Sequence, residues 1–205
     1  DPSATFADGD VLKLGNGATV SNPITLDSPD SSITFEVTDG TVTWAANQGE
    51  NNGVSLVKVA TGATLDITSN ESELCVFASK QNADVTIELA AGAKMKSLNI
   101  FGWGNGTRHD AHRVVNMGAG SEWTIKDNTN FYLNRTDINL SGGTIVIGEG
   151  SKVWFERRQS SINTIADATQ MSVIRGAGEI KTGNNGAESG GYVFNVVRGH
   201  YAIDA

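Results

Sequence analysis

The stretch DVTIELAAGAKM, residues 84–95, shows the pattern that decides the fold. Apolar residues alternate with Asp, Thr and Glu across residues 84–89, which is the pattern of a β-strand with one buried face and one solvated face. A Gly-Ala pair then leads into a second short strand-like segment. The same alternation recurs along the chain at residues 32–37, 41–44, 64–67, 122–125 and 144–147. Because Gly-, Asn- and Asp-rich turns separate these segments, the chain is predicted to be all-β.

The Gly-Ala pair belongs to a degenerate repeat. A glycine, a small residue, any residue and an apolar residue follow one another at residues 17–20, 62–65, 92–95, 120–123 and 150–153, and a shortened form begins at Gly178. After a first gap long enough for an extra unit, the spacing is about 28 to 30 residues. A fixed period in this range indicates a solenoid. We expect glycine to occupy the same corner of every coil, where a tight bend requires a positive φ angle.

The sequence therefore predicts one domain, residues 1–205, that folds as a parallel β-helix of about seven coils. Residues 1–15 are expected to form its N-terminal edge, and residues 183–205 a strand-like C-terminal end. A propeller is disfavoured because one blade needs about 40 residues. A β-sandwich or jelly roll is the alternative, since both also consist of short alternating strands joined by turns. The best helical candidate is the short run at residues 161–168.

Three segments carry a resemblance to a known group. They are DGTVTW at residues 39–44, SGGTIVI at residues 141–147 and GEGSKVWF at residues 148–155. These sequence patterns resemble those of the passenger domains of autotransporters and related bacterial surface proteins, which are right-handed, pectate-lyase-like β-helices. The resemblance covers roughly residues 8–182. The resemblance implies the fold, a location at the cell surface, and a role as adhesin, surface-layer subunit or filament subunit. A minority of that group are polysaccharide lyases or hydrolases.

Charge and composition disfavour several classes of protein. The 23 acidic and 15 basic residues give a net charge of −8, whereas nucleic acids and anionic membranes attract positive surfaces. No apolar run is long enough for a membrane span, so no membrane insertion is expected. Cys75 is the single cysteine; it cannot form an internal disulfide and is expected to be buried. The start at Asp1 without methionine fits a secreted chain after signal cleavage, and equally a shortened chain.

The segment most similar to a ligand site is residues 101–113, which interrupts the alternation. A long Gly-rich loop leaving a solenoid is a usual place for binding residues. His109, Asp110 and His112 have the chemistry of metal ligands, but the spacing offers no third and fourth ligand, so no metal is predicted. In the alternative interpretation, an arginine forms an ion pair with the carboxylate of an acidic sugar, and a tryptophan stacks on the sugar ring. The candidate residues are Trp103, Arg108, His109, Asp110, His112 and Arg113. A solvated loop or an assembly contact is the competing interpretation.

Trp44 and Trp123 fall at inward positions of alternating strands and are predicted to be core residues. Trp154, in contrast, is a second candidate for ligand binding. Val153 and Phe155 share one face of their strand, and Trp154 takes the other. If Val153 and Phe155 point inward, Trp154 is exposed beside Arg157, as in a sugar platform or a subunit contact.

No catalytic signature supports an enzyme. The chain has no Gly-x-Ser-x-Gly elbow, phosphate-binding loop or Cys-x-x-Cys motif, and no group of aspartates such as a lyase would use to hold calcium. No cofactor is expected. The alternative function that remains is a carbohydrate-binding module, or a polysaccharide-degrading β-helix enzyme that uses residues 101–113.

The C-terminal residues suggest assembly. A solenoid exposes unpaired backbone at its ends unless a cap covers them, and the sequence shows no amphipathic capping helix. Either the chain is part of a longer rod, or its ends pair head to tail into a filament. The expected assembly contacts are Tyr192, Phe194, Val196, Tyr201 and Ile203. We expect a secreted or cell-surface structural protein that associates with itself, with adhesion as a further role and carbohydrate as a further partner.

Overall fold

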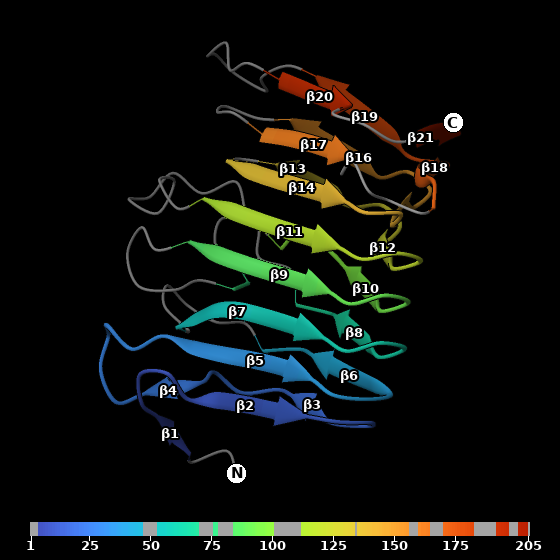
Figure 1. Cartoon of the computed structure of the whole chain (residues 1–205). Coiled ribbons are helices and arrows are strands. Elements are labelled where there is room, and N and C mark those ends of the chain that lie inside the picture. The colour runs from blue at the N-terminus through green and yellow to red at the C-terminus, as the bar shows by residue number, and fades with distance from the viewer. Residues whose placement is uncertain are drawn as a thin grey trace.

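Parallel strands stack along one axis in the protein (Figure 1). The computed structural model describes residues 4–46, 53–69, 76–77, 84–100, 112–133, 135–155, 160–164, 170–182, 192–196 and 201–204. All regular elements among these residues are strands, and their pairings are parallel. The predicted β-helix is therefore confirmed, and the sandwich alternative, which requires antiparallel sheets, is wrong.

Two eight-stranded sheets form the length of the solenoid. Sheet 1 contains β2 (Val11–Leu14), β5 (Ile33–Val37), β7 (Val54–Val59), β9 (Val85–Leu89), β11 (Arg113–Met117), β14 (Thr136–Leu140), β17 (Ser160–Thr164) and β20 (Tyr192–Val196). Sheet 2 contains β3 (Thr19–Val20), β6 (Thr41–Trp44), β8 (Thr64–Ile67), β10 (Lys94–Ser97), β12 (Glu122–Ile125), β15 (Thr144–Ile147), β18 (Ser172–Gly176) and β21 (Tyr201–Asp204). Eight strands in each sheet are close to the expected seven coils.

Two smaller sheets complete the architecture. Sheet 3 contains β13 (Asn130–Leu133), β16 (Lys152–Phe155) and β19 (Glu179–Thr182), and β1 (Thr5–Phe6) pairs with β4 (Thr25–Leu26). In the C-terminal half the chain passes from sheet 1 to sheet 2 and then to sheet 3 before it returns to sheet 1. The helical prediction for residues 161–168 is wrong where the structure describes them, because residues 160–164 form β17.

Glycine defines the corner between sheets 1 and 2, but only part of the predicted repeat lies there. Six glycines at this corner have φ between 53° and 80°: Gly17, Gly40, Gly62, Gly92, Gly120 and Gly142. Gly40 belongs to the extra unit expected in the first gap. Gly150 and Gly178 instead precede strands of sheet 3, so the prediction that they share this corner is wrong.

Coil length also varies more than the repeat suggested. Trp123 pairs with Ile145, 22 residues later, whereas Leu65 pairs with Met95, 30 residues later. Turns absorb these differences because the surface tolerates extra residues while the strands keep their register.

The core runs along the inside of the stack. From β5 to β17, alternate residues of the strands point inward and are buried, as the sequence pattern predicts. Trp44 and Trp123 are fully buried, which confirms their prediction as core residues. The ring of Trp44 makes edge contacts with Phe35 and Phe77 at centroid distances of 5.0 and 4.9 Å. Cys75 lies outside the described residues.

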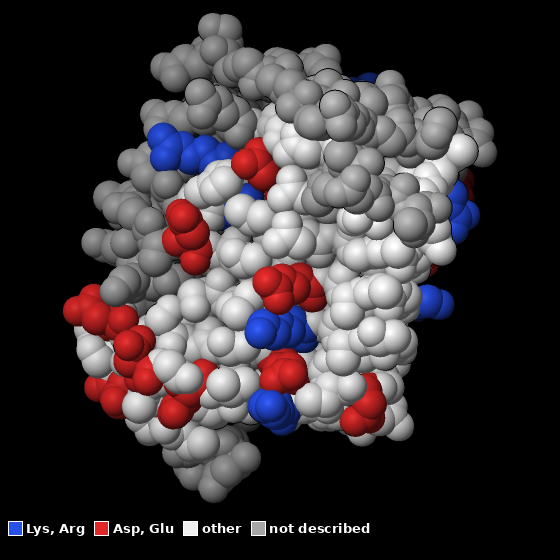
Figure 2. All heavy atoms as spheres, viewed as in Figure 1, with Lys and Arg blue, Asp and Glu red and all other residues white. Residues whose placement is uncertain are grey.

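The outward side chains of sheet 1 lie in rows, where a row is a set of residues in register across neighbouring strands. One row begins with alternating charges at Lys13, Glu36, Lys58 and Glu88. Figure 2 shows a column of alternating blue and red side chains on this face. Lys13 and Glu36 form an ion pair at 3.1 Å. The row then continues through asparagines, which contribute to the polar network described next.

Candidate functional site

The structure describes the end of the predicted ligand loop but not its centre. Four of the candidate residues, Trp103, Arg108, His109 and Asp110, lie outside the described residues. His112 precedes β11 and is half-exposed, whereas Arg113 begins that strand and is only 4% exposed. Ligand binding by these residues stays a prediction.

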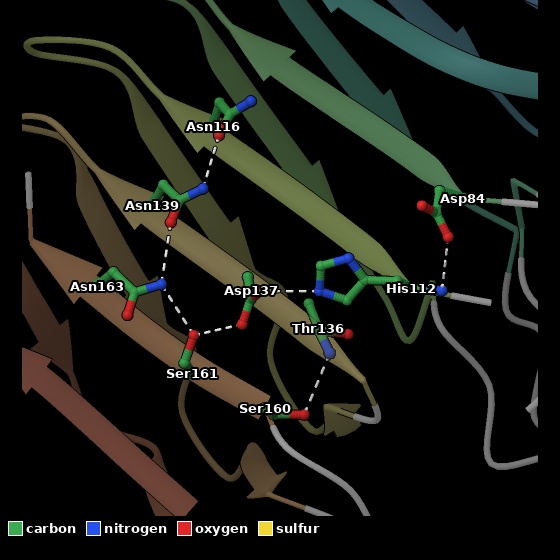
Figure 3. A network of polar contacts seen from close by, with 9 residues as sticks. All are labelled: Asp84, His112, Asn116, Thr136, Asp137, Asn139, Ser160, Ser161 and Asn163. Atoms are coloured by element: carbon green, nitrogen blue, oxygen red, sulfur yellow. Dashed lines mark hydrogen bonds and ion pairs between the residues drawn. The ribbon is translucent and has the colours of Figure 1, made fainter. Parts of the chain in front are cut away.

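His112 joins a polar network that crosses neighbouring coils (Figure 3). Its ring Nε2 lies 2.8 Å from Asp137 Oδ2 on β14. Its backbone N–H donates to Asp84 Oδ1 at 3.2 Å, just before β9. The hydroxyl of Ser161 on β17 donates to the other oxygen of Asp137. The side chains of His112 and Asp137 are 42% and 33% exposed, so water screens this pair and its contribution to stability is small.

The order of the groups in this network does not match nucleophilic catalysis. In a serine triad, histidine stands between serine and aspartate, so that the imidazole accepts the serine proton. Here Asp137 stands between His112 and Ser161. The Ser161 hydroxyl therefore donates its hydrogen bond to a carboxylate and not to an imidazole. This arrangement links β14 to β17 and does not activate the serine as a nucleophile.

Asparagines continue the network along the solenoid axis. Asn139 Nδ2 donates to Asn116 Oδ1 at 2.8 Å, and Asn163 Nδ2 donates to Asn139 Oδ1 at 3.0 Å. We call Asn116, Asn139 and Asn163 the asparagine ladder. Asn163 Nδ2 also donates to Ser161 Oγ at 2.9 Å, which joins the ladder to the Asp137 group. Each link between two asparagines connects one coil to the next.

The sequence contained a signal for this ladder that alternation alone does not reveal. An apolar residue directly before asparagine occurs at residues 115–116, 138–139, 162–163 and 194–195. These four asparagines occupy one row, since β11, β14, β17 and β20 pair in that register. Asp137 and Ser161 were missed because their proximity depends on the lengths of turns between strands.

Replacing Asn139 by alanine is expected to lower the free energy of unfolding by about 1 kcal/mol, because two neutral hydrogen bonds are lost at a half-buried position where water can replace them. Urea denaturation followed by circular dichroism measures this change. Thr86→Ala, at a half-buried outward position of β9, is the control and should cost less. Equal losses in both variants would contradict a role for the ladder in stability.

Trp154 lies on the outward side of sheet 3. Its neighbours Val153 and Phe155 are buried, as the first part of the prediction required. Trp154 itself is half-buried rather than fully exposed, and it is in register with Tyr132 on β13 and Lys181 on β19. Its indole N–H is buried and has no hydrogen-bond partner among the described residues. Arg157 lies outside the described residues.

Lys181 in this row is paired with Glu179. Its hydrogen bond to the Glu179 carboxylate and its positive charge lower the pKa of Glu179. Sheet 3 thus presents two aromatic rings in register beside an ion pair.

The predicted assembly residues lie on the last two strands. Tyr192, Phe194 and Val196 belong to β20, and Tyr201 and Ile203 belong to β21. These strands end sheets 1 and 2 in the described stack.

The described residues show two further features. They contain no group of three or more His, Cys, Asp or Glu residues placed to hold a metal ion. Where the structure is described, no helix is long and apolar enough to cross a membrane.

The fold places the chain in the class of parallel β-solenoids. Comparisons with family models, with curated proteins and with solved structures found no match. The function must therefore be argued from the surfaces and the ends of the solenoid.

Proposed function

We propose that the chain is an extracellular structural protein that associates with itself, as a filament or surface-layer subunit, with adhesion as an accompanying role. The observation that carries the proposal is how the polar groups of sheet 1 are used. The asparagine ladder and the Asp137 network connect strand to strand along the axis. A shallow hollow of about 460 Å³ on this face is lined by Asn116 and Asn139, but the hydrogen bonds of the two amides run to each other and along the axis. An enzyme site would require charged groups that converge on one reacting atom.

The length of the core also supports a structural role. Buried side chains extend from β5 to β18, so every coil in this span is packed against its neighbours. In a solenoid of this kind stability is a sum over adjacent coils, which suits a rod that bears load or spaces other domains.

Self-association is tested by sedimentation velocity at protein concentrations from micromolar to hundreds of micromolar, together with negative-stain electron microscopy. The sedimentation coefficient is expected to rise with concentration, and the images are expected to show elongated assemblies. A single monomer species throughout this range, without fibres or arrays, would contradict the proposal.

Carbohydrate binding is the second candidate, and the aromatic row of sheet 3 is what favours it. Tyr132 and Trp154 are in register, and Lys181 continues their row. Aromatic rings side by side are a usual platform for sugar rings. A glycan array followed by calorimetry tests this idea, with Trp154→Ala as the variant expected to lose binding and Leu56→Ala on sheet 1 as the control.

A further inference from the structure

The N-terminal end of the stack has an apolar hollow. Its volume is about 330 Å³, and it lies beside β1, β2 and β3. We call it the N-terminal cup and define it by the apolar side chains that line it: Phe6, Leu12, Leu14, Val20 and Ile24. These residues are only partly buried and pack against the core on one side.

The cup exists because the first coil has a neighbour on only one side among the described residues. Leu12 and Leu14 occupy the same inward rows as Phe35 and Val37 of β5. Phe35 and Val37 are completely buried, whereas Leu12 and Leu14 remain partly accessible. The apolar rows of sheet 1 therefore continue to β2, and no described strand covers them beyond it.

The backbone of β2 is also open at this end. The carbonyl groups of Asp10 and Leu14 accept hydrogen bonds from Thr34 and Thr38 on the β5 side. Within one peptide group the carbonyl and the N–H point to opposite sides of the strand, and every second group has the same orientation, so the amides of Val11 and Lys13 face away from β5. No described strand pairs with that edge, and the Val11 side chain is 46% exposed. An open strand edge beside apolar side chains is a template for another strand.

We propose that the N-terminal cup receives the C-terminal coil of a second copy, with β20 of that copy adding to β2 as a parallel strand. The proposal rests on the self-association proposed above and specifies its surface and direction. Because the two contacting surfaces differ, the contact does not close on itself and the assembly grows head to tail.

The register of sheet 1 defines how the two ends meet. Row by row, Leu12 corresponds to Phe194 of β20, and Leu14 corresponds to Val196. Leu12, Leu14, Phe194 and Val196 are all apolar residues, so β20 paired with β2 in this register would place apolar residues in the same rows on both sides of the junction. The outward row of Val11 likewise ends at Val193.

Charge favours this arrangement over a symmetric one. Residues 1–50 contain eight acidic residues and one basic residue, whereas residues 151–205 contain five acidic and six basic residues. Figure 2 shows acidic side chains gathered over the end that carries β1 and β2. Two N-terminal ends facing each other would repel, while head-to-tail contact brings the acidic end to the less acidic one. A second copy in this orientation is thus the occupant that the charges favour.

The first test compares two identical substitutions. Leu12→Lys places a charge in the cup, and a lysine there can extend its amine to water in the free monomer. Leu56→Lys is the control at a half-buried outward position in the middle of sheet 1. Sedimentation velocity is expected to show association weakened at least tenfold for Leu12→Lys and unchanged for Leu56→Lys. Circular dichroism verifies that both variants fold.

The outcomes separate the two proposals. A wild-type chain that stays monomeric overturns self-association and the head-to-tail contact together. If the wild-type chain assembles and Leu12→Lys assembles as tightly, only the proposed contact at the N-terminal cup is overturned. The same conclusion follows if Leu12→Lys and Leu56→Lys weaken association equally.

A cross-linking test specifies the register and does not depend on a charged cup. With Cys75→Ser in each variant, Val11→Cys combined with Val193→Cys is expected to form disulfide-linked dimers and longer oligomers on oxidation. The control combines Val11→Cys with Asn195→Cys, two positions further along the strand, which places the sulfurs beyond disulfide reach. If both combinations formed the same series of cross-linked oligomers, or if both stayed monomeric, the proposed register would be overturned.

Discussion

Trp44→Ala is expected to lower the free energy of unfolding by about 3–5 kcal/mol, the range for removing a large aromatic side chain from a core. Trp44 is completely buried and contacts Phe35 and Phe77 edge to face. Each such aromatic pair adds about 0.5–1.5 kcal/mol beyond burial. Equilibrium unfolding in urea measures the loss. Trp154→Ala, at a half-buried outward position, should cost clearly less, and equal losses would contradict the core assignment.

Conservative substitutions refine this test because the two core tryptophans differ in one contact. The indole N–H of Trp123 donates to Ser97 Oγ at 2.9 Å, whereas that of Trp44 has no partner among the described residues. Trp123→Phe leaves the Ser97 hydroxyl without its donor, and Trp44→Phe removes an N–H that gains nothing from burial. We therefore expect Trp44→Phe to be tolerated better. A larger loss for Trp44→Phe would indicate that its N–H has a partner outside the described residues.

The strands and the core could be predicted from sequence because both are local properties. A strand places alternate side chains on opposite faces, so burial of one face leaves its pattern in consecutive residues. Trp44 and Trp123 were placed correctly in the core on this basis. The glycine corner was predictable for the same reason, since a positive φ angle selects glycine position by position.

The third sheet and the polar network could not be predicted in the same way. Gly150 resembles the corner glycines in its local sequence, yet it precedes β16 of sheet 3. What distinguishes it is the number of residues in the coil, and turns vary in length without changing the strands on either side. The contact between His112 and Asp137 has the same origin. Two residues 25 positions apart meet because one particular coil has that length.

The same dependence on register makes one glycine critical. Gly176, at the end of β18, has a φ of 130° and pairs with Ile147 of β15. A Cβ atom at Gly176 would lie 2.1 Å from the Ile147 carbonyl oxygen and 2.8 Å from its nitrogen. These are backbone atoms in a paired strand, so they cannot move away without breaking the pairing.

Gly176→Ala is therefore expected to lower the free energy of unfolding by about 2–6 kcal/mol, because backbone strain and overpacking of about 1–3 kcal/mol each act at one site. Gly62→Ala is the matched control: its φ is 74°, and a Cβ there meets nothing within 4 Å. That variant should cost about 1–2 kcal/mol, from the left-handed conformation alone. Urea denaturation of both variants separates the two causes. If they lost equal stability, the packing of β18 against β15 would not be as close as the structure shows, since conformational strain alone would explain both.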